Sequence, residues 1–165
     1  MRKTWFTLCT AAVILIVMVS SAFAADIMEV AMRQNNLKTF VSAVKAAGLT
    51  DTLNGTGPFT VFAPSDAAFK KLPKTTLNAL LKPENKARLA SILKYHVIKG
   101  KVTAREAMDM KSGTMVTTVG GSKLKITHSK SGVFINGAKV TMTDIMADNG
   151  VIHVINTVLM PSANR

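Results

Sequence analysis

Ser65 and Asp66 are an adjacent pair that could carry out acyl-transfer chemistry, within GPFTVFAPSDAAFKKLP at residues 57–73. A nucleophilic serine requires a base, an orienting acid and an oxyanion hole. A nucleophile elbow also requires glycines that allow its strained turn, and Ala63 and Ala67 stand at those positions. The pair is therefore interpreted as a helix start, with Ser65 as N-cap and Asp66 near the positive helix end.

Three histidines are the other candidates for chemistry: His96, His128 and His153. None is paired with another at metal-ligand spacing, so we expect no metal site and no cofactor. His153 lies inside the apolar run VIHVI, and His96 follows Tyr95 in LKYHVIKG. Both are expected to be buried or half-buried polar groups, which need hydrogen-bond partners.

Other common functional signatures are missing from the sequence. There is no glycine-rich phosphate loop, and the nine acidic residues are dispersed. Basic residues are not interleaved with aromatic ones, so no nucleic-acid partner is expected. We therefore predict a protein that is not an enzyme.

Helical patterns dominate the first half of the chain. The apolar side chains within residues 37–44 recur at helical spacing, and Gly48 follows as a stop signal. Pro83 is expected to open a helix, and Thr103 to Glu106 form a capping box that starts another. Most of the eight methionines after residue 24 are expected in the core, with Met108 and Met110 as candidates for an exposed edge.

Strand patterns dominate the second half. Residues 123–127 alternate between polar and apolar, and residues 151–155 are nearly all apolar, as in a strand covered on both faces. Turn signals separate the strands, at residues 120–121, 131–132, 136–137 and 149–150. With an early strand at residues 59–62, the pattern predicts an α+β fold with helices packed against a curled sheet or sandwich.

The first 24 residues have the pattern of a secretory signal peptide: a basic start, an apolar run and Ala22-Phe23-Ala24 as the cleavage site. Residues 25–165 are then expected to form a single domain that contains no cysteine and must be held together by packing. The protein is expected to be secreted, either to the periplasm or outside the cell.

The positive charge is concentrated in one region of the chain. Residues 70–111 contain eleven Lys and Arg against three Asp and Glu, a net charge of +8. A secreted basic protein meets anionic polysaccharides or an anionic membrane surface before nucleic acid. The alternative is a generic solubilising face, because the lysines are scattered at the spacing of a helix surface.

Three stretches together resemble the signatures of the fasciclin domain family: FTVFAPSDAAF at residues 59–69, LKYHVIKGKV at residues 93–102 and NGVIHVINTVLMP at residues 149–161. The resemblance covers about residues 25–163. It implies a wedge-shaped β-sandwich with a cluster of helices packed on one side. It also implies that the first stretch is a fold signature, whose structural residues here are Phe62, Pro64, Ser65 and Asp66, with His153 in the closing stretch.

The resemblance also implies where a partner would bind. The family's proposed contact motifs correspond to Tyr95 and His96, and to Asp144, Ile145 and Met146. For Tyr95 and His96 the alternative role is packing in the core. For Asp144 two interpretations stay open, a structural role and an exposed carboxylate that contacts a partner. Asp66 and His96 are further expected to form a hydrogen-bonded pair across the core.

These observations lead to one principal function and two alternatives. The first is a secreted, non-enzymatic adhesion module that binds a cell-surface protein, a matrix protein or an anionic polysaccharide; membrane-surface contact and the oligomeric state are left open. The second is a small-molecule or lipid-binding protein, which requires an apolar pocket. The third is a hydrolase, which requires a Ser or Thr near His96 or His153 in an open cleft.

Overall fold

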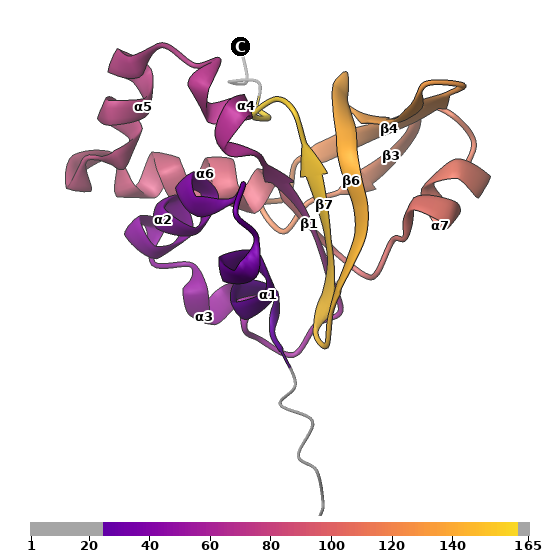
Figure 1. The fold of residues 1–165 in the computed structure, drawn as a ribbon, viewed down its shortest axis with the longest axis horizontal. Helices are drawn as coiled ribbons and strands as arrows, with labels where there is room; N and C mark the ends of the chain where they lie inside the picture. The colour runs from indigo at the N-terminus through magenta and orange to yellow at the C-terminus, as the bar shows by residue number, and fades with distance from the viewer. Residues whose placement is uncertain (1–24, 162–165) are drawn as a thin grey trace, which may run out of the picture.

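A computed structural model describes residues 25–161 of the chain (Figure 1). Its strands pair into one seven-stranded sheet, in the order β2-β1-β7-β6-β5-β4-β3. The strands are β1 (Phe59–Pro64), β2 (Val97–Lys99), β3 (Thr114–Thr117), β4 (Lys123–Ser129), β5 (Gly132–Ile135), β6 (Ala138–Ala147) and β7 (Gly150–Ile155). β1 and β7 are parallel, although 85 residues separate the end of β1 from the start of β7, and the other pairs are antiparallel. The early strand therefore lies inside the sheet, between β2 and the last strand.

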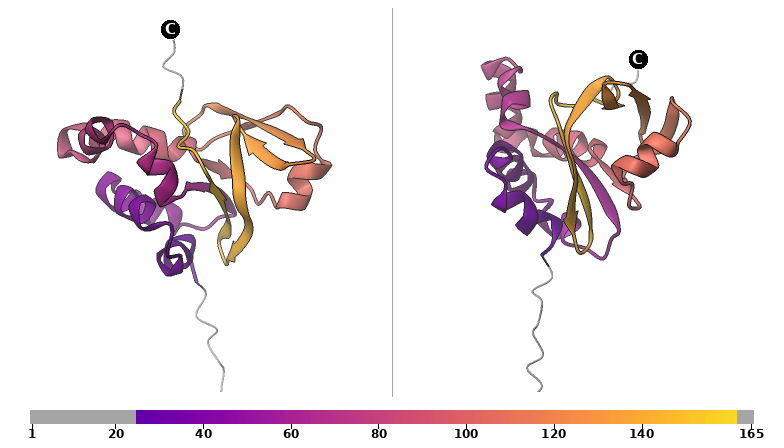
Figure 2. Two further views of the ribbon diagram at one scale, coloured as in Figure 1. Left: turned by 45° about the horizontal axis from the view of Figure 1, so that its top comes forward. Right: turned by 45° about the vertical axis from the view of Figure 1, so that its right-hand side comes forward.

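Helices cover one face of this central pair. The helices are α1 (Ile27–Arg33), α2 (Lys38–Ala47), α3 (Thr50–Leu53), α4 (Asp66–Lys70), α5 (Lys74–Leu81), the 3₁₀ helix η1 (Pro83–Asn85), α6 (Lys86–Tyr95) and α7 (Ala104–Asp109). Both views in Figure 2 place α1 to α6 on one side of β1 and β7, with the curled remainder of the sheet and α7 on the other. The α+β prediction is confirmed, and the sandwich is a single sheet that curls over and nearly closes on itself.

Two apolar cores lie on opposite faces of β1 and β7. The first is formed by the helices with Val61, Ile152 and Val154, and the second by the curled strands with Phe62 and Ile155. Every residue of β7 is buried, as predicted for a strand covered on both faces.

Local sequence signals account for the element boundaries. Gly48 ends α2 in the left-handed conformation, with φ of 70°. Thr103 accepts a hydrogen bond from the Glu106 N–H, and Glu106 accepts one from the Thr103 N–H, which is the predicted capping box. Pro83 opens the short helix that leads into α6.

The prediction that most methionines lie in the core is wrong, whereas the exposure expected of Met108 is confirmed. Met28 is buried and Met110 is partly buried against the second core. Six others are exposed: Met32, Met108, Met115, Met142, Met146 and Met160. Exposed methionines provide adaptable apolar contact points, since the side chain is flexible and polarisable.

The predicted signal peptide, residues 1–24, lies outside the described residues. Across residues 25–161, the helices are too short or too polar to cross a bilayer.

Candidate functional site

β6 is irregular at the position of the predicted contact motif. Its register with β7 shifts twice, between Val140 and Met142 and again between Met142 and Ile145. Asp144 lies in the second shift and has φ of 57°, a left-handed conformation that aspartate tolerates better than most residues. Bulges of this kind bend a strand and re-aim its side chains. Ile145 consequently packs against the first core, while Met146 is 50% exposed.

Asp144 is held by the elements around it. Its Oδ1 accepts a hydrogen bond of 2.9 Å from the N–H of Ala104, the first residue of α7. Its own N–H donates to Nδ1 of His153 at 3.3 Å. Because Nδ1 accepts, the His153 proton lies on Nε2, which donates to the Val102 carbonyl at 2.7 Å. The network ties the bulge to β7 and to the start of α7.

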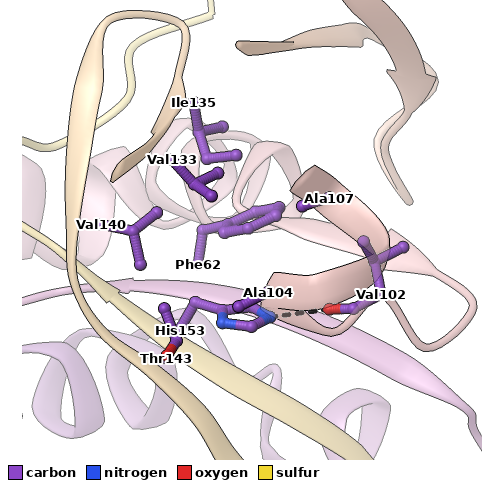
Figure 3. A pocket seen from close by; sticks show the side chains of 9 residues that line it. All are labelled: Phe62, Val102, Ala104, Ala107, Val133, Ile135, Val140, Thr143 and His153. Carbon is purple, nitrogen blue, oxygen red and sulfur yellow. Dashed lines mark hydrogen bonds between the residues drawn. The ribbon is translucent and has the colours of Figure 1, made fainter. Parts of the chain in front are cut away.

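His153 is buried, and its environment is apolar. Its ring stacks on Phe62, with centroids 5.7 Å apart, and the two rings line a small pocket with Val102, Ala107 and Val140 (Figure 3). Burial lowers the pKa of His153, more strongly than the Val102 carbonyl and the Asp144 charge raise it. His153 is therefore neutral at neutral pH.

Tyr95 and His96 are buried at the end of α6. The Tyr95 hydroxyl accepts from the Asn136 side chain at 2.6 Å and donates to the Lys123 carbonyl at 3.3 Å. His96 is completely buried. A partner would meet neither ring directly, so their burial favours the packing alternative for both residues.

The predicted hydrogen bond between Asp66 and His96 is absent, and that prediction is wrong. Asp66 Oδ1 instead accepts from the N–H of Thr39 at 2.8 Å, in the first turn of α2. Both ring nitrogens of His96 bond to the backbone: Nδ1 donates to the Ile92 carbonyl at 2.8 Å, and Nε2 accepts from the Leu159 N–H at 2.9 Å. Asp66 therefore stabilises the start of a neighbouring helix.

Ser65 has the capping role expected of it. Its Oγ accepts from the Ala68 N–H at 3.2 Å at the start of α4, and the preceding Pro64 ends β1 in the buried sheet. Neither His96 nor His153 can serve as the general base that the hydrolase alternative requires, because both ring nitrogens of each bond to backbone groups. No cluster of potential metal ligands occurs within residues 25–161.

The basic region of the sequence does not form a single surface. Part of it lies on the helical side of the molecule, and we name these exposed residues the helical basic patch: Lys70, Lys71, Lys74, Lys82, Lys86 and Arg88. Lys99 lies on β2, which pairs with β1 at the edge of the sheet. Lys101 and Arg105 lie just before and on α7, which Figure 1 places on the other side of β1 and β7. Among residues 25–161, the one ion pair joins Arg33 to Glu29, so neither group of cations is neutralised by ion pairing.

A model of the fasciclin domain family matches residues 35–161 of this chain. The chain belongs to the fasciclin domain family. Among its relatives is Protein sll1483 of Synechocystis, which is 46% identical over 138 residues, covering 84% of this chain and 74% of the relative. The cell surface glycolipoprotein MPB83 of Mycobacterium bovis is 38% identical over 132 residues, covering 77% of this chain and 56% of the relative.

Larger fasciclin-domain proteins also match. The transforming growth factor-beta-induced protein ig-h3 of Sus scrofa is 42% identical over 144 residues, covering 84% of this chain and 20% of that protein. The solved FAS1 domain pair of the insect cell adhesion molecule Fasciclin I has a TM-score of 0.74 at 21% identity, covering 83% of this chain and 51% of that chain. This likeness shows the fold.

One residue of this fasciclin domain that sequence reasoning missed is Asn149. Its Oδ1 accepts from the N–H of Ile27, and its Nδ2 donates to the carbonyls of Leu53 and Gly55. In the sequence it is half of a turn dipeptide with Gly150, and nothing in the local pattern indicates partners 94 to 122 positions away.

Proposed function

We propose that this fasciclin domain is a secreted adhesion module that binds a cell-surface or matrix component through the β6 bulge. We name its contact surface the bulge surface, formed by Asp144 and Met146. The proposal is supported by family membership, and by relatives whose names describe a cell surface protein and a cell adhesion molecule.

The geometry of the bulge supports this choice of surface. Met146 presents an apolar side chain that is half exposed, beside a carboxylate fixed in position by Ala104 and His153. Within residues 25–161, Asp144 Oδ2 accepts no hydrogen bond, so it is free to accept one from a partner. A contact point that is already ordered loses little conformational entropy on binding.

The helical basic patch has a different role in this proposal. Exposed cations attract anionic polysaccharides and membrane surfaces over a distance of about 10 Å at 0.1 M salt. Such attraction accelerates encounter, while a packed contact determines how long the complex lasts. We propose that the helical basic patch accelerates encounter with the partner and that the bulge surface determines how long the complex lasts.

The small-molecule alternative has less support. Two apolar pockets, one beside Phe62 and His153 and one beside Phe40 and Leu93, have volumes of about 10 Å³ each, which is room for a single water molecule. The larger hollows are open grooves on the surface. A drug-sized ligand requires a pocket of about 300–1,000 Å³ that encloses most of its surface.

The test is cell attachment to a surface coated with the purified protein, counted at low and high salt for the producing cells and for a host cell type. Attachment should persist at high salt, and Met146→Gln should weaken it about fivefold, as expected for losing about 1 kcal/mol of apolar contact. Met32→Gln is the matched control, because Met32 is 51% exposed but lies on α1. Equal effects of the two substitutions, or attachment abolished by salt, would exclude the bulge surface.

Asp144→Asn separates charge from structure in the same assay. Asparagine keeps an oxygen for the Ala104 N–H and tolerates the left-handed conformation, but it carries no charge. Reduced attachment with unchanged unfolding would assign the contact to the carboxylate charge. Unchanged attachment would confine the contact to Met146.

A further inference from the structure

The strands that curl over the second core also have an outer face. In β4 and β5, alternate side chains are buried in that core: Leu124, Ile126, Val133 and Ile135. The side chains between them point the other way, because successive residues of a strand alternate between its two faces. Paired residues of neighbouring strands share a face, which extends the outward set to β3 and β6. We name this surface the outer sheet face, formed by Met115, Lys123, Lys125, Thr127, Phe134 and Lys139.

Phe134 is the aromatic side chain of the outer sheet face, and it belongs to neither core. Every other aromatic side chain within residues 25–161 packs in the first or the second core. The Phe134 ring is partly exposed, and Met115, two strands away on the same face, is 53% exposed. Packing within a core therefore does not account for an aromatic residue at this position, and the ring is available to a partner.

The outer sheet face lies in a segment of the chain without acidic residues. Residues 112–143 contain four lysines and neither Asp nor Glu. Three of the four, Lys123, Lys125 and Lys139, are exposed on the outer sheet face, and none of the three forms an ion pair within residues 25–161. This second basic segment is separate from the one at residues 70–111. A surface with charges of one sign attracts a partner of the opposite sign.

Two of these lysines flank the Phe134 ring. Lys139 is paired with Phe134 on β6, and the Cβ atoms of paired residues lie about 5 Å apart. Lys125 is a diagonal neighbour on β4, because Phe134 pairs with Thr127, and diagonal neighbours lie about 7–8 Å apart. Since β4 and β6 lie on opposite sides of β5, the ring has a cation on each side.

From these features we infer that the outer sheet face binds an acidic polysaccharide, a linear polymer of sugars that carry carboxylates. A sugar ring presents C–H groups with a partial positive charge, which pack on the negative face of an aromatic ring. The carboxylates pair with Lys125 and Lys139 on either side of Phe134. A membrane surface fits less well, because a ring that lies partly buried within a sheet does not project into the acyl region. The inference does not rest on the adhesion proposal, because it concerns another surface with its own variants.

The probe is a galacturonic acid decamer, titrated into the purified protein and followed by isothermal titration calorimetry. Salt at about 0.15 M suppresses long-range attraction during the titration. The control ligand is a glutamate decamer, which has the same number of side-chain carboxylates and no sugar ring. The galacturonic acid decamer should bind saturably and at least tenfold more tightly than the glutamate decamer. Equal affinities would show a surface that attracts anions without recognising sugars, and this result or the absence of saturable binding would overturn the inference.

Variants of the outer sheet face test where the polysaccharide binds. Phe134→Leu should weaken binding of the galacturonic acid decamer about fivefold, while Phe134→Tyr, which keeps the ring, should retain it. Urea unfolding checks that Phe134→Leu stays folded, as expected for a side chain outside both cores. Lys139→Gln should weaken binding more than Lys82→Gln, which removes the same charge from the helical basic patch. The inference would be overturned if neither Phe134→Leu nor Lys139→Gln changed the affinity, or if Phe134→Leu abolished binding to phosphatidylglycerol vesicles and left binding of the decamer intact.

Discussion

His96 shows how a polar side chain can serve as an internal connector. The Leu159 N–H donates to Nε2, so the proton lies on Nδ1 and is donated to the Ile92 carbonyl. The ring thereby joins the end of α6 to the segment that follows β7. Only the neutral ring can do this, because a protonated imidazole has no acceptor for Leu159.

The unfolding free energy should therefore depend on pH. Burial lowers the pKa of His96 from 6.5 to about 4, against a smaller opposing effect of the Ile92 carbonyl. Between these values the unfolded chain binds a proton and the folded chain does not, so stability is complete above pH 6.5 and is lost as the pH falls towards 4. The loss from this residue should be about 3 kcal/mol.

Urea unfolding at a series of pH values from 7 to 4 measures this dependence. The variant His96→Gln should be less stable at pH 7, but its stability should decline less steeply with acid. His153 contributes in the same direction, because burial also lowers its pKa. A slope that is identical in the variant and the parent protein would show that His96 does not titrate on unfolding.

At the scale of elements, Asn149 links segments that are distant in the sequence. Its side chain connects the turn between β6 and β7 to the start of α1 and to the end of α3. The neighbouring Gly150 permits this close packing, because a Cβ there would lie 2.0 Å from the Phe59 carbonyl oxygen. Asparagine suits the position because its amide both accepts and donates.

Asn149→Ala should destabilise the protein by about 2–3 kcal/mol, because three buried or half-buried backbone groups lose their partner. Asn149→Asp should cost at least as much, because it places a carboxylate oxygen against the Leu53 and Gly55 carbonyls, although the other oxygen can still accept from Ile27. Urea unfolding at pH 7 is the measurement. Asn78→Ala on the exposed side of α5 is the control and should change stability by less than about 0.5 kcal/mol. Equal costs for Asn78 and Asn149 would refute the linking role.

The elements predicted correctly are those specified by neighbouring residues. The stop at Gly48, the capping box at Thr103 and the alternation of residues 123–127 depend on spacings of a few positions, and all three are confirmed. The predicted hydrogen bond between Asp66 and His96 is wrong because the partner of each side chain is decided by long-range packing. Leu159 and Thr39, the partners found instead, contribute backbone N–H groups, which every residue except proline carries and which leave no signature in a sequence.

Only part of the candidate site could be predicted from the sequence, because the rest depends on contacts between residues that are distant in the chain. The motif around Asp144 was located from the resemblance, and the role of its residues in binding stays a prediction. The double register shift of β6, where Asp144 accepts from the first residue of α7, has no counterpart in the sequence pattern. The contact between β2 and β3 could not be predicted at all, since these two edges meet only when the sheet curls.

At the scale of the whole molecule, β1 and β7 are shared by the two cores, so neither core can remain intact when the central strands separate. Unfolding should therefore be a single transition. The helical content near 222 nm reports on the first core, and a fluorine label on Tyr95, the only tyrosine, reports on the second.

Matched substitutions in the two cores test this coupling. Ile92→Val lies in the first core and Ile126→Val in the second, and each should cost about 1 kcal/mol. Each variant should shift the midpoint of both signals equally. Separate midpoints, with each substitution affecting its own core alone, would show that the cores unfold independently.

The position of the two ends of the domain relative to β7 has a mechanical consequence. The Ala25 carbonyl accepts from the Asp148 N–H, next to the beginning of β7, while the chain continues from the far end of the same strand (Figure 1). Tension between these ends runs along β7, which is held by β1 on one side and β6 on the other. The force is a shear that loads many backbone hydrogen bonds at once, where peeling would load them one at a time.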